Sequence, residues 1–450
     1  MNAIIKYNLD KKIYSNKKEY FFTFLNCRYE LMNSKLIALL QKRYKKKKFE
    51  PIYILSAEPG KYHQKSNYII INKELKRLQQ KTKNKKIVLL QDLEDLNIEF
   101  SESKFVQALI DKLSKKQDKI FLISFTSFGL KVNNKKIINI GPRAELVEKY
   151  DSKIEQIKLF KKLKLPINET RIYSNIDKLK KAKLTYPGFI SPTYTSGGAE
   201  SAILFSNKDL KVFFSKLRRV NKDKGFFVAK YVKDVQSSPN SVGIVCKKND
   251  VRVLCLTDQI IRGIKHTGNI YPTSANKSNQ KKMITITKKI GNHLSALGFR
   301  GMYGCDFIID NKGKLSVVEL NPRRQSCYLI LQLMSKKINL LDVELKLALG
   351  ESIPKFKYND IQVKYSWLHN KLKPYLKYQV LKKEFRINNE DSPFSKNGKN
   401  FICSYFPKDY VLSNCNFFGY YIASGENYNT LLKKSKEEIE NILLNSLKDA

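Results

Sequence analysis

The sequence predicts an α/β protein that begins with a largely parallel sheet and ends in a small α+β segment. Short β-rich runs alternate with helical patterns in the first third of the chain, which is typical of a parallel sheet with connecting helices. Two later β-rich runs flank a polar turn, which predicts a hairpin. After residue 355, strand-like runs lead into a final helical pattern at residues 429–447.

The first part of the chain holds several short β-rich runs separated by other segments. Residues 103–116 carry apolar side chains at helical spacing and predict a helix between two of these runs. The runs are residues 51–55, 68–71, 86–90 and 119–125, and residues 137–142 end the pattern. We expect a first domain, with a parallel sheet, over residues 1–143.

The central region mixes helices, strands and turns, and we divide it into domains at residues 144–224 and 225–355. Pro166 ends the first helical pattern. The predicted elements are a helix at 144–165, a strand–turn–strand at 186–206, a strand at 225–232, a hairpin at 242–261, a long polar loop at 262–280, a helix at 281–298 and a second hairpin at 305–321. Residues 356–450 are expected to form a small C-terminal α+β domain.

The net charge of +44, taken alone, indicates a nucleic acid or an anionic membrane as the partner. However, the 72 Lys and 13 Arg are spread along the chain, and residues 43–50 form the only dense cluster. We therefore expect that nucleic acid is not the main partner. The sequence has no apolar run of membrane-spanning length, no signal-peptide pattern and no paired spacing among its seven cysteines. A cytoplasmic location with no membrane contact is the simplest expectation.

The second hairpin lies within residues 301–324, GMYGCDFIIDNKGKLSVVELNPRR, and carries one acid on each strand. If residues 311–314 make the turn, Asp306 lies directly opposite Glu319, and Asn321 shares their face. Opposed carboxylates destabilise a hairpin unless a cation lies between them. Two carboxylates and an amide oxygen suit Mg²⁺, which usually also holds substrate phosphates. A surface hairpin whose acids pair with lysines is the alternative.

The order of these segments resembles the ATP-grasp superfamily of ligases over roughly residues 120–350. The strongest part is GCDFIIDNKGKLSVVELNPRR, which looks like the paired metal-binding strands of that family. The resemblance implies a two-lobed ATP-grasp fold behind an N-terminal pre-ATP-grasp domain, with biotin-carboxylase-like and peptide-ligase-like features. It implies ATP and Mg²⁺ or Mn²⁺ as cofactors, held by Asp306, Glu319 and Asn321. Arg323 would face the γ-phosphate or the acyl phosphate.

Two weaker segments would bind the phosphates. YDSKIEQ resembles the Asp-Lys start of a helix, whose lysine, here Lys153, reaches the ATP phosphates. TSGGAES resembles the glycine-rich loop that closes over them, with Ser196, Gly197 and Gly198 at its turn. Glycines allow backbone N–H groups to form an anion-binding nest. An ordinary hairpin turn is the alternative for this segment.

A third segment, FFVAKYV, resembles the strand that binds adenine. The resemblance assigns the backbone groups of Lys230, Tyr231 and Val232 to the edge of the base. The chain departs from the family before the glycine-rich loop, where Ser191 stands at the place of a usual phosphate-binding lysine. A hydroxyl offers a hydrogen bond but no positive charge. Lys153 is the first candidate to replace that charge.

The activity that the resemblance implies is the joining of a carboxylate to an amine through an acyl phosphate, with ADP and phosphate released. Lys153 and Arg323 would stabilise the developing charge. Small-molecule carboxylates and amines would be the partners, and a homodimer is an assembly that such ligases often adopt. The alternatives are a catalytically degraded member that only binds nucleotide, a phosphotransferase and a basic nucleic-acid-binding protein. His266 would lie in a loop near the acceptor, where a surface role is more typical than a base.

Overall fold

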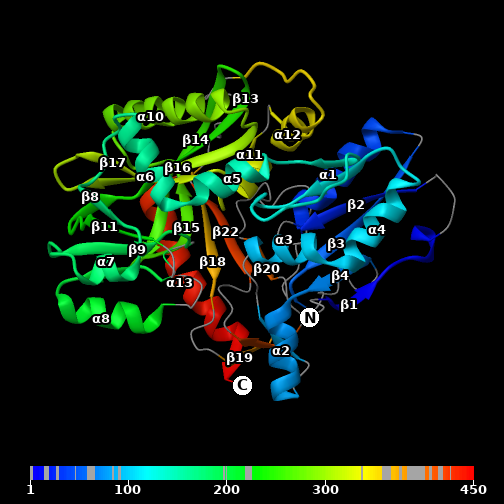
Figure 1. The fold of residues 1–450 in the computed structure, drawn as a ribbon, viewed down its shortest axis with the longest axis horizontal. Coiled ribbons are helices and arrows are strands. Elements are labelled where there is room, and N and C mark those ends of the chain that lie inside the picture. The colour runs from blue at the N-terminus through cyan, green and yellow to red at the C-terminus, as the bar shows by residue number, and fades with distance from the viewer. Residues whose placement is uncertain are drawn as a thin grey trace. The chain divides into compact units, whose positions relative to one another are not determined.

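The computed structural model contains two compact units, one formed by Met1–Ala144 together with Cys327–Ala450 and the other by Glu145–Ser326. Figure 1 shows the elements of both. The described residues are 4–14, 20–26, 30–45, 47–57, 66–83, 86–89, 93–195, 198, 200–217, 225–335, 338–356, 366–373, 378–382, 401–404, 408–413, 419–425 and 427–449. None of the described helices is long and apolar enough to cross a membrane.

The first unit contains the predicted parallel sheet, in the order β1-β4-β3-β2-β6-β7. All neighbouring strands are parallel except β1 and β4. Strands β4 and β6 are buried along their whole length, as expected for parallel strands that are covered on both faces. The strands are β1 (Ile4–Asn8), β2 (Tyr20–Asn26), β3 (Lys48–Leu55), β4 (Asn67–Ile71), β6 (Ile120–Ile123) and β7 (Ile137–Asn139).

Helices accompany this sheet, and two of them begin at side-chain caps. Asn72 accepts the backbone N–H of Leu75 at the start of α2, and Ser103 accepts that of Val106 at the start of α4. Apolar residues of α3, α4 and the strands form one buried core. The helical elements are η1 (Lys11–Ile13), α1 (Glu30–Arg43), α2 (Lys73–Thr82), α3 (Leu93–Glu102) and α4 (Lys104–Ser114).

The C-terminal segment has the predicted α+β character, but it also pairs with a strand from the first part of the chain. β5 (Ile87–Val88) runs parallel to β21 (Val411–Ser413) in a sheet of order β23-β19-β21-β5. Their pattern predicted that residues 86–90 belong to the first sheet. That prediction is wrong, because β5 lies in this other sheet. The remaining elements are α11 (Tyr328–Met334), α12 (Leu340–Ala348), β18 (Ser366–Leu372), β19 (Tyr378–Leu381), β20 (Phe401–Ser404), β22 (Gly419–Gly425), α13 (Tyr428–Ser446) and β23 (Leu447–Asp449). The four-domain division stays a prediction.

The second unit begins with two short helices and an antiparallel sheet of order β10-β9-β11-β8. Ser152 separates α5 from α6, because its hydroxyl caps α6 through the N–H of Glu155. The glycine-rich turn joins β9 to β10, as predicted. The elements are α5 (Ala144–Asp151), α6 (Lys153–Lys162), β8 (Thr170–Tyr173), α7 (Ile176–Lys180), β9 (Gly188–Pro192), β10 (Ala202–Leu204), α8 (Asn207–Lys216) and β11 (Phe226–Lys230).

A second sheet of this unit has the order β12-β16-β13-β14-β15, and β17 pairs with β16. Helix α10 covers one face (Figure 1), where Thr287 bonds to Ser241 and Tyr303. Because side chains alternate along a strand, residues such as Asp306 and Asn240 lie on the other face. The elements are β12 (Val235–Ser237), β13 (Pro239–Lys247), β14 (Asp250–Arg262), β15 (Lys265–Tyr271), α10 (Lys277–Ala296), β16 (Gly301–Asp310) and β17 (Leu315–Asn321).

The predicted loop at residues 262–280 is wrong, because its first half forms β15. The sequence KHTGNIY has no alternation of apolar and polar residues, so it gave no strand signal. Its buried polar side chains are satisfied inside the sheet instead. Asn269 donates to Thr257 Oγ1 at 3.1 Å, and Thr267 donates to the carbonyl of Ile260 at 2.9 Å. Buried hydrogen bonds, and not alternating apolar side chains, therefore stabilise this strand in the sheet.

The β16–β17 hairpin confirms the predicted pairing of Asp306 with Glu319, although its turn and its register differ from those predicted. The turn is one residue longer than expected, since Ile309 pairs with Leu315. A bulge between Asp306 and Phe307 leaves Val318 as the extra residue and restores the register. Without the bulge, a one-residue slip would turn Glu319 to the other face.

Candidate functional site

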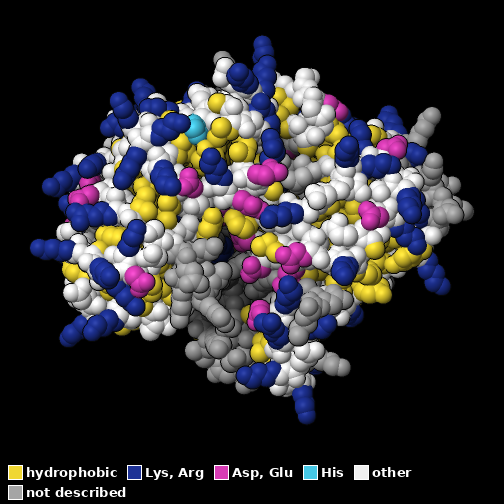
Figure 2. Space-filling model, viewed as in Figure 1, with side chains coloured by type: hydrophobic (Ala, Val, Ile, Leu, Met, Phe, Trp, Pro, Cys, Tyr) yellow, Lys and Arg dark blue, Asp and Glu magenta, His cyan; other side chains and the backbone are white. Residues whose placement is uncertain are grey.

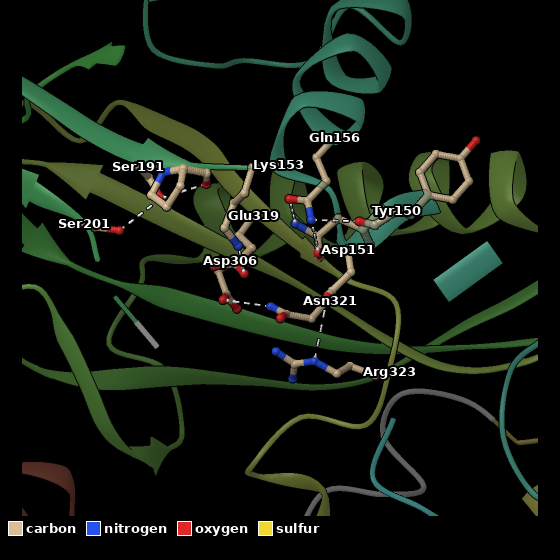
Figure 3. Close-up of polar contacts among 12 residues, drawn as sticks. Tyr150, Asp151, Lys153, Gln156, Ser191, Ser201, Asp306, Glu319, Asn321 and Arg323 are labelled. Carbon is tan, nitrogen blue, oxygen red and sulfur yellow. Dashed lines mark hydrogen bonds and ion pairs between the residues drawn. The ribbon is translucent and has the colours of Figure 1, made fainter. Parts of the chain in front are cut away.

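The two acids of the hairpin meet on the face of the sheet that α10 leaves open, as Figure 3 shows. Asp306 is only 5% exposed, and side-chain amides donate hydrogen bonds to its carboxylate. The donors include Asn240 at 2.8 Å, Asn321 at 3.0 Å and Gln325 at 3.1 Å. The amides orient this carboxylate without neutralising its charge.

Burial raises the pKa of Asp306 to about 6, and the nearby charge of Glu319 adds to the rise. Hydrogen bonding from Asn240 and the positive charge of Arg323 oppose the rise. Two acids held on one face, one of them buried, are unfavourable without a cation. The arrangement is therefore suited to a positively charged partner.

Lys153 supplies one such charge in the structure. It is the first residue of α6, directly after the Ser152 cap, and its ammonium forms an ion pair with Glu319. The backbone N–H of Lys153 donates to the carbonyl of Thr193 at 3.0 Å, two residues beyond Ser191. The start of α6 is thus tied both to the hairpin acids and to the strand that leads into the glycine-rich loop.

Arg323 lies near a further acid that the sequence reasoning did not select. Its Nε is 4.0 Å from Oδ1 of Asp151, the residue that ends α5. Burial raises the pKa of Asp151, against the opposing charges of Arg323 and Lys153. The site therefore combines three carboxylates with two cations from α5, α6 and the hairpin.

The glycine-rich loop is described only in part. Gly198 has a φ of +77°, and a Cβ there would lie 2.1 Å from the carbonyl oxygen of Ile264, so only glycine fits this place. Ser191 is buried at the end of β9 and accepts a hydrogen bond from Ser201 at 3.0 Å. Ser196 and Gly197 lie outside the described residues.

The predicted adenine-binding segment follows the end of β11. The N–H of Lys230 donates to Glu169 and that of Tyr231 donates to Pro187, at 2.8 and 3.2 Å. These two bonds occupy the N–H groups of Lys230 and Tyr231. They do not involve the N–H of Val232 or the backbone carbonyls of the segment. Pro187 immediately precedes β9, so the segment lies at one end of this strand and Ser191 lies near the other.

The residues of the hairpin fit a hard divalent cation by their chemistry. Asp306 and Glu319 offer carboxylate oxygens on one face, and rotation of the Asn321 amide would present its oxygen there. The amide oxygen of Gln325 is buried and has no hydrogen-bond partner among the described residues. No group of three His, Cys, Asp or Glu able to hold a metal occurs in the described part of the chain. Such a small protein donor set suits an ion that also takes phosphate oxygens.

Gln325 and Gln156 are site residues that the sequence reasoning missed. Gln325 follows the Asn-Pro-Arg-Arg motif directly, and its side chain lies over Gly304, where a Cβ would be 1.8 Å from the amide oxygen. Gln156 stands within the quoted segment YDSKIEQ and bonds to the backbone beside Glu319. The signal for both was their position next to a motif, since neither carries a charge.

His266 is not the surface loop residue that its sequence context favoured. It lies in β15, is half-buried, and its Nε2 is 3.1 Å from Oδ1 of Asn269. Asn269 also accepts from Ser326 at 3.0 Å and donates to Thr257, which in turn donates to Asn240 at 3.0 Å. A buried row of hydrogen bonds therefore runs from His266 to the amide that holds Asp306.

Comparison with known proteins gives the same family. Residues 151–327 match the family model of the ATP-grasp domain. The carbamoyl phosphate synthase large chain of Clostridium botulinum is 26% identical over 228 residues, which are 49% of this chain and 21% of that protein. The L-propargylglycine–L-glutamate ligase of Streptantibioticus cattleyicolor is 29% identical over 107 residues, which are 24% of this chain and 22% of that protein. The chain thus spans about a fifth of the length of these curated relatives.

Solved structures show the same fold over nearly the whole chain. The biotin carboxylase of Campylobacter jejuni has a TM-score of 0.64 at 14% identity and covers 97% of this chain and 93% of its own. The ADP complex of N5-carboxyaminoimidazole ribonucleotide synthetase has a TM-score of 0.57 at 13% identity and covers 94% of this chain and 96% of its own. The predicted α/β architecture with an ATP-grasp fold is confirmed. Residues 151–327 form an ATP-grasp domain, in a chain whose fold is similar to that of these solved structures.

Proposed function

We propose that the chain is an ATP-dependent ligase that activates a substrate carboxylate as an acyl phosphate and joins it to an amine, releasing ADP and phosphate. The observation that carries the proposal is the pairing of Asp306 with Glu319 next to Lys153. By their names, relatives of the domain include a ligase that acts on two amino acids and a synthase of carbamoyl phosphate. Small-molecule carboxylates and amines are therefore the proposed substrates.

Asp306, Glu319 and Asn321 would hold Mg²⁺ or Mn²⁺. A bound ion would neutralise phosphate oxygens and align the triphosphate. One structural neighbour was solved with the magnesium salt of ADP, which supports nucleotide and magnesium as the pair to test. In this reading, the Lys153 ammonium turns from Glu319 towards the phosphates when nucleotide arrives.

The nucleotide would lie between the end of β9 and the segment after β11. The backbone of Lys230, Tyr231 and Val232 would bind the base, with the N–H of Val232 as the donor. The hydroxyl of Ser191 and backbone N–H groups of the loop at Ser196, Gly197 and Gly198 would bind phosphate oxygens. This leaves Lys153 as the main cation for the α- and β-phosphates, in place of the usual lysine on β9.

The proposed reaction has two steps. The substrate carboxylate attacks the γ-phosphorus of ATP, the bond to the β-phosphate oxygen breaks, and ADP leaves. The amine nitrogen then attacks the acyl carbon, the acyl–oxygen bond breaks, and phosphate leaves with the loss of one proton from nitrogen. Lys153 and Arg323 stabilise the charge that develops on the transferred group. The glycine-rich loop excludes water, because water would hydrolyse the acyl phosphate.

A second candidate function is nucleotide binding without ligation. The observation that favours it is Ser191, which brings a hydroxyl and no charge to the place of a phosphate-binding lysine. Nucleic acid stays an unfavoured partner. Lys and Arg side chains are dispersed over the face drawn in Figure 2 and are not gathered into one patch.

The test is a screen for ADP release with pooled amino acids, dipeptides and small carboxylic acids, followed by mass spectrometry of any condensed product. We expect ADP only when an acid and Mg²⁺ are both present, and a product equal to acid plus amine minus water. Glu319→Gln should abolish this release, whereas Glu74→Gln, which removes an exposed acid from the first unit, should not. Tight ATP binding with no ADP in any pool would establish the second candidate instead.

A further inference from the structure

Gln156 is a buried glutamine whose side-chain amide makes three hydrogen bonds to the backbone. Its Nε2 donates to the carbonyl of Tyr150 at 2.8 Å and to that of Leu320 at 2.7 Å. Its Oε1 accepts the N–H of Leu320 at 2.9 Å. The side chain is 1% exposed, and both amide hydrogens and the oxygen are engaged.

Leu320 is the residue between the two proposed metal ligands of β17, Glu319 and Asn321. Its backbone groups point away from β16, because Gln156 and not a strand binds both of them. Among the described strands, β17 pairs only with β16, so its outer edge needs other partners. Gln156 fills this need at Leu320, and the carbonyl of Pro166 does so for the N–H of Val317, at 2.8 Å.

The same side chain also fixes the place of Lys153. Gln156 stands three residues after Lys153 on α6, so the two side chains lie on one side of the helix. Its bond to Tyr150 holds the end of α5 against the start of α6. One amide thus joins the helix that carries the phosphate lysine to the strand that carries two metal ligands (Figure 3).

We propose that Gln156 is a positioning residue, which holds Lys153 and the strand Glu319–Asn321 in the register that binds metal and triphosphate together. This inference rests on the proposed function of the site. Gln156 touches neither nucleotide nor metal in this scheme. It sets the distance between the Lys153 ammonium and the two proposed metal ligands, Glu319 and Asn321. Without this amide, the positions of α6 and β17 would be set separately.

Only a carboxamide of this length satisfies the three backbone groups. An ionised Glu has no N–H to donate, and its oxygens would face the carbonyls of Tyr150 and Leu320. Met has nearly the same shape and makes none of these bonds. Asn keeps the amide but is one methylene shorter, so it cannot reach both backbone segments.

The experiment compares Gln156→Met and Gln156→Asn with wild type and with a matched control elsewhere. Asn72 is the control, because its buried amide also donates to two carbonyls, those of Ser56 and Leu89, and accepts one backbone N–H, that of Leu75. It lies in the first unit and outside residues 151–327. Asn72→Leu therefore removes the same set of hydrogen bonds without touching the site. Mn²⁺ affinity is measured by electron paramagnetic resonance, with and without ATP, beside the melting temperature.

We expect both Gln156 variants to raise the Kd for Mn²⁺ in the presence of ATP by about tenfold or more, as for other residues that orient metal ligands. Asn72→Leu should lower the melting temperature by about as much as the Gln156 variants do, and it should leave the Kd for Mn²⁺ unchanged. Unchanged Mn²⁺ affinity in a folded Gln156 variant overturns the inference, and so does a failure of both variants to fold while Asn72→Leu folds. If wild type binds neither Mn²⁺ nor ATP, the proposed function itself is wrong.

Discussion

Replacing Asp306 by Asn should stabilise the chain without metal and remove its response to metal. Asp306 is nearly fully buried, and burial, with the charge of Glu319 adding, raises its pKa from 3.8 to about 6. Asn has the same shape and no charge. Its amide can keep the bond from Asn240, and Asn321 can rotate to accept from the new N–H group.

The magnitude follows from the shift in pKa. Each pKa unit corresponds to about 1.36 kcal/mol, so the ionised Asp306 costs the folded chain about 3 kcal/mol. The folded chain keeps the proton to higher pH than the unfolded chain does. The contribution of Asp306 to stability therefore becomes more unfavourable as pH rises from about 3.8 to about 6 and levels off above that. The Asn variant lacks this contribution, so its advantage should be about 3 kcal/mol at about pH 8 and close to zero at about pH 4.

The assay is urea unfolding of both proteins in EDTA across this pH range. Differences between the two proteins report on Asp306 together with its electrostatic interaction with Glu319, because the remaining titrating groups are shared. Mg²⁺ with ATP should then raise the melting temperature of wild type and leave that of Asp306→Asn unchanged. An Asn variant that is less stable than wild type at about pH 8 would refute the electrostatic reasoning.

Three further predictions concern other parts of the ATP-grasp domain. Lys153→Ala should raise the KM for ATP or lower kcat, because it removes the cation paired with Glu319; wild-type kinetics would place the phosphate charge elsewhere. Gly198→Ala should weaken ATP binding in calorimetry and lower the melting temperature, because a Cβ would clash with the carbonyl of Ile264 and the backbone would have to shift; unchanged affinity would mean that the loop does not close there. Burial, helped by nearby lysines, lowers the pKa of His293, so the folded chain favours the neutral ring, and the contribution of this residue to stability is lost as pH falls below about 6.5; urea unfolding of His293→Gln should lack this contribution, and an unchanged pH dependence would exclude this residue as its cause.

Much of the fold was predictable because its signals are local. The parallel sheet, the β9–β10 turn and the hairpin acids follow from short patterns of apolar residues, glycines and charges. The pairing of β5 with β21 could not be predicted, because it joins segments more than three hundred residues apart. A two-residue strand has no pattern of its own, so only tertiary structure decides which sheet it enters.

Apart from Asp151, the unpredicted part of the site consists of uncharged polar groups. Asn240, Gln325 and Gln156 are invisible to charge patterns and to hydrophobic periodicity, yet they hold Asp306 and the backbone beside Glu319. The strand β15 escaped prediction for the same reason. Such residues are recognised only when the fold shows which buried donors and acceptors they satisfy.

The bulge in β17 shows how weakly the hairpin sequence alone fixes the site. A turn of either length is compatible with the residues between Asp310 and Leu315; without a bulge, the shorter turn places Glu319 opposite Asp306 and the longer turn places Val318 there. The outer edge of β17 resolves this, because Pro166 binds Val317 before the bulge and Gln156 binds Leu320 after it. The extra residue is thereby confined between two fixed points. Because the contacts that confine it come from α6 and the segment after it, the helix with the phosphate lysine also sets the register of the metal ligands.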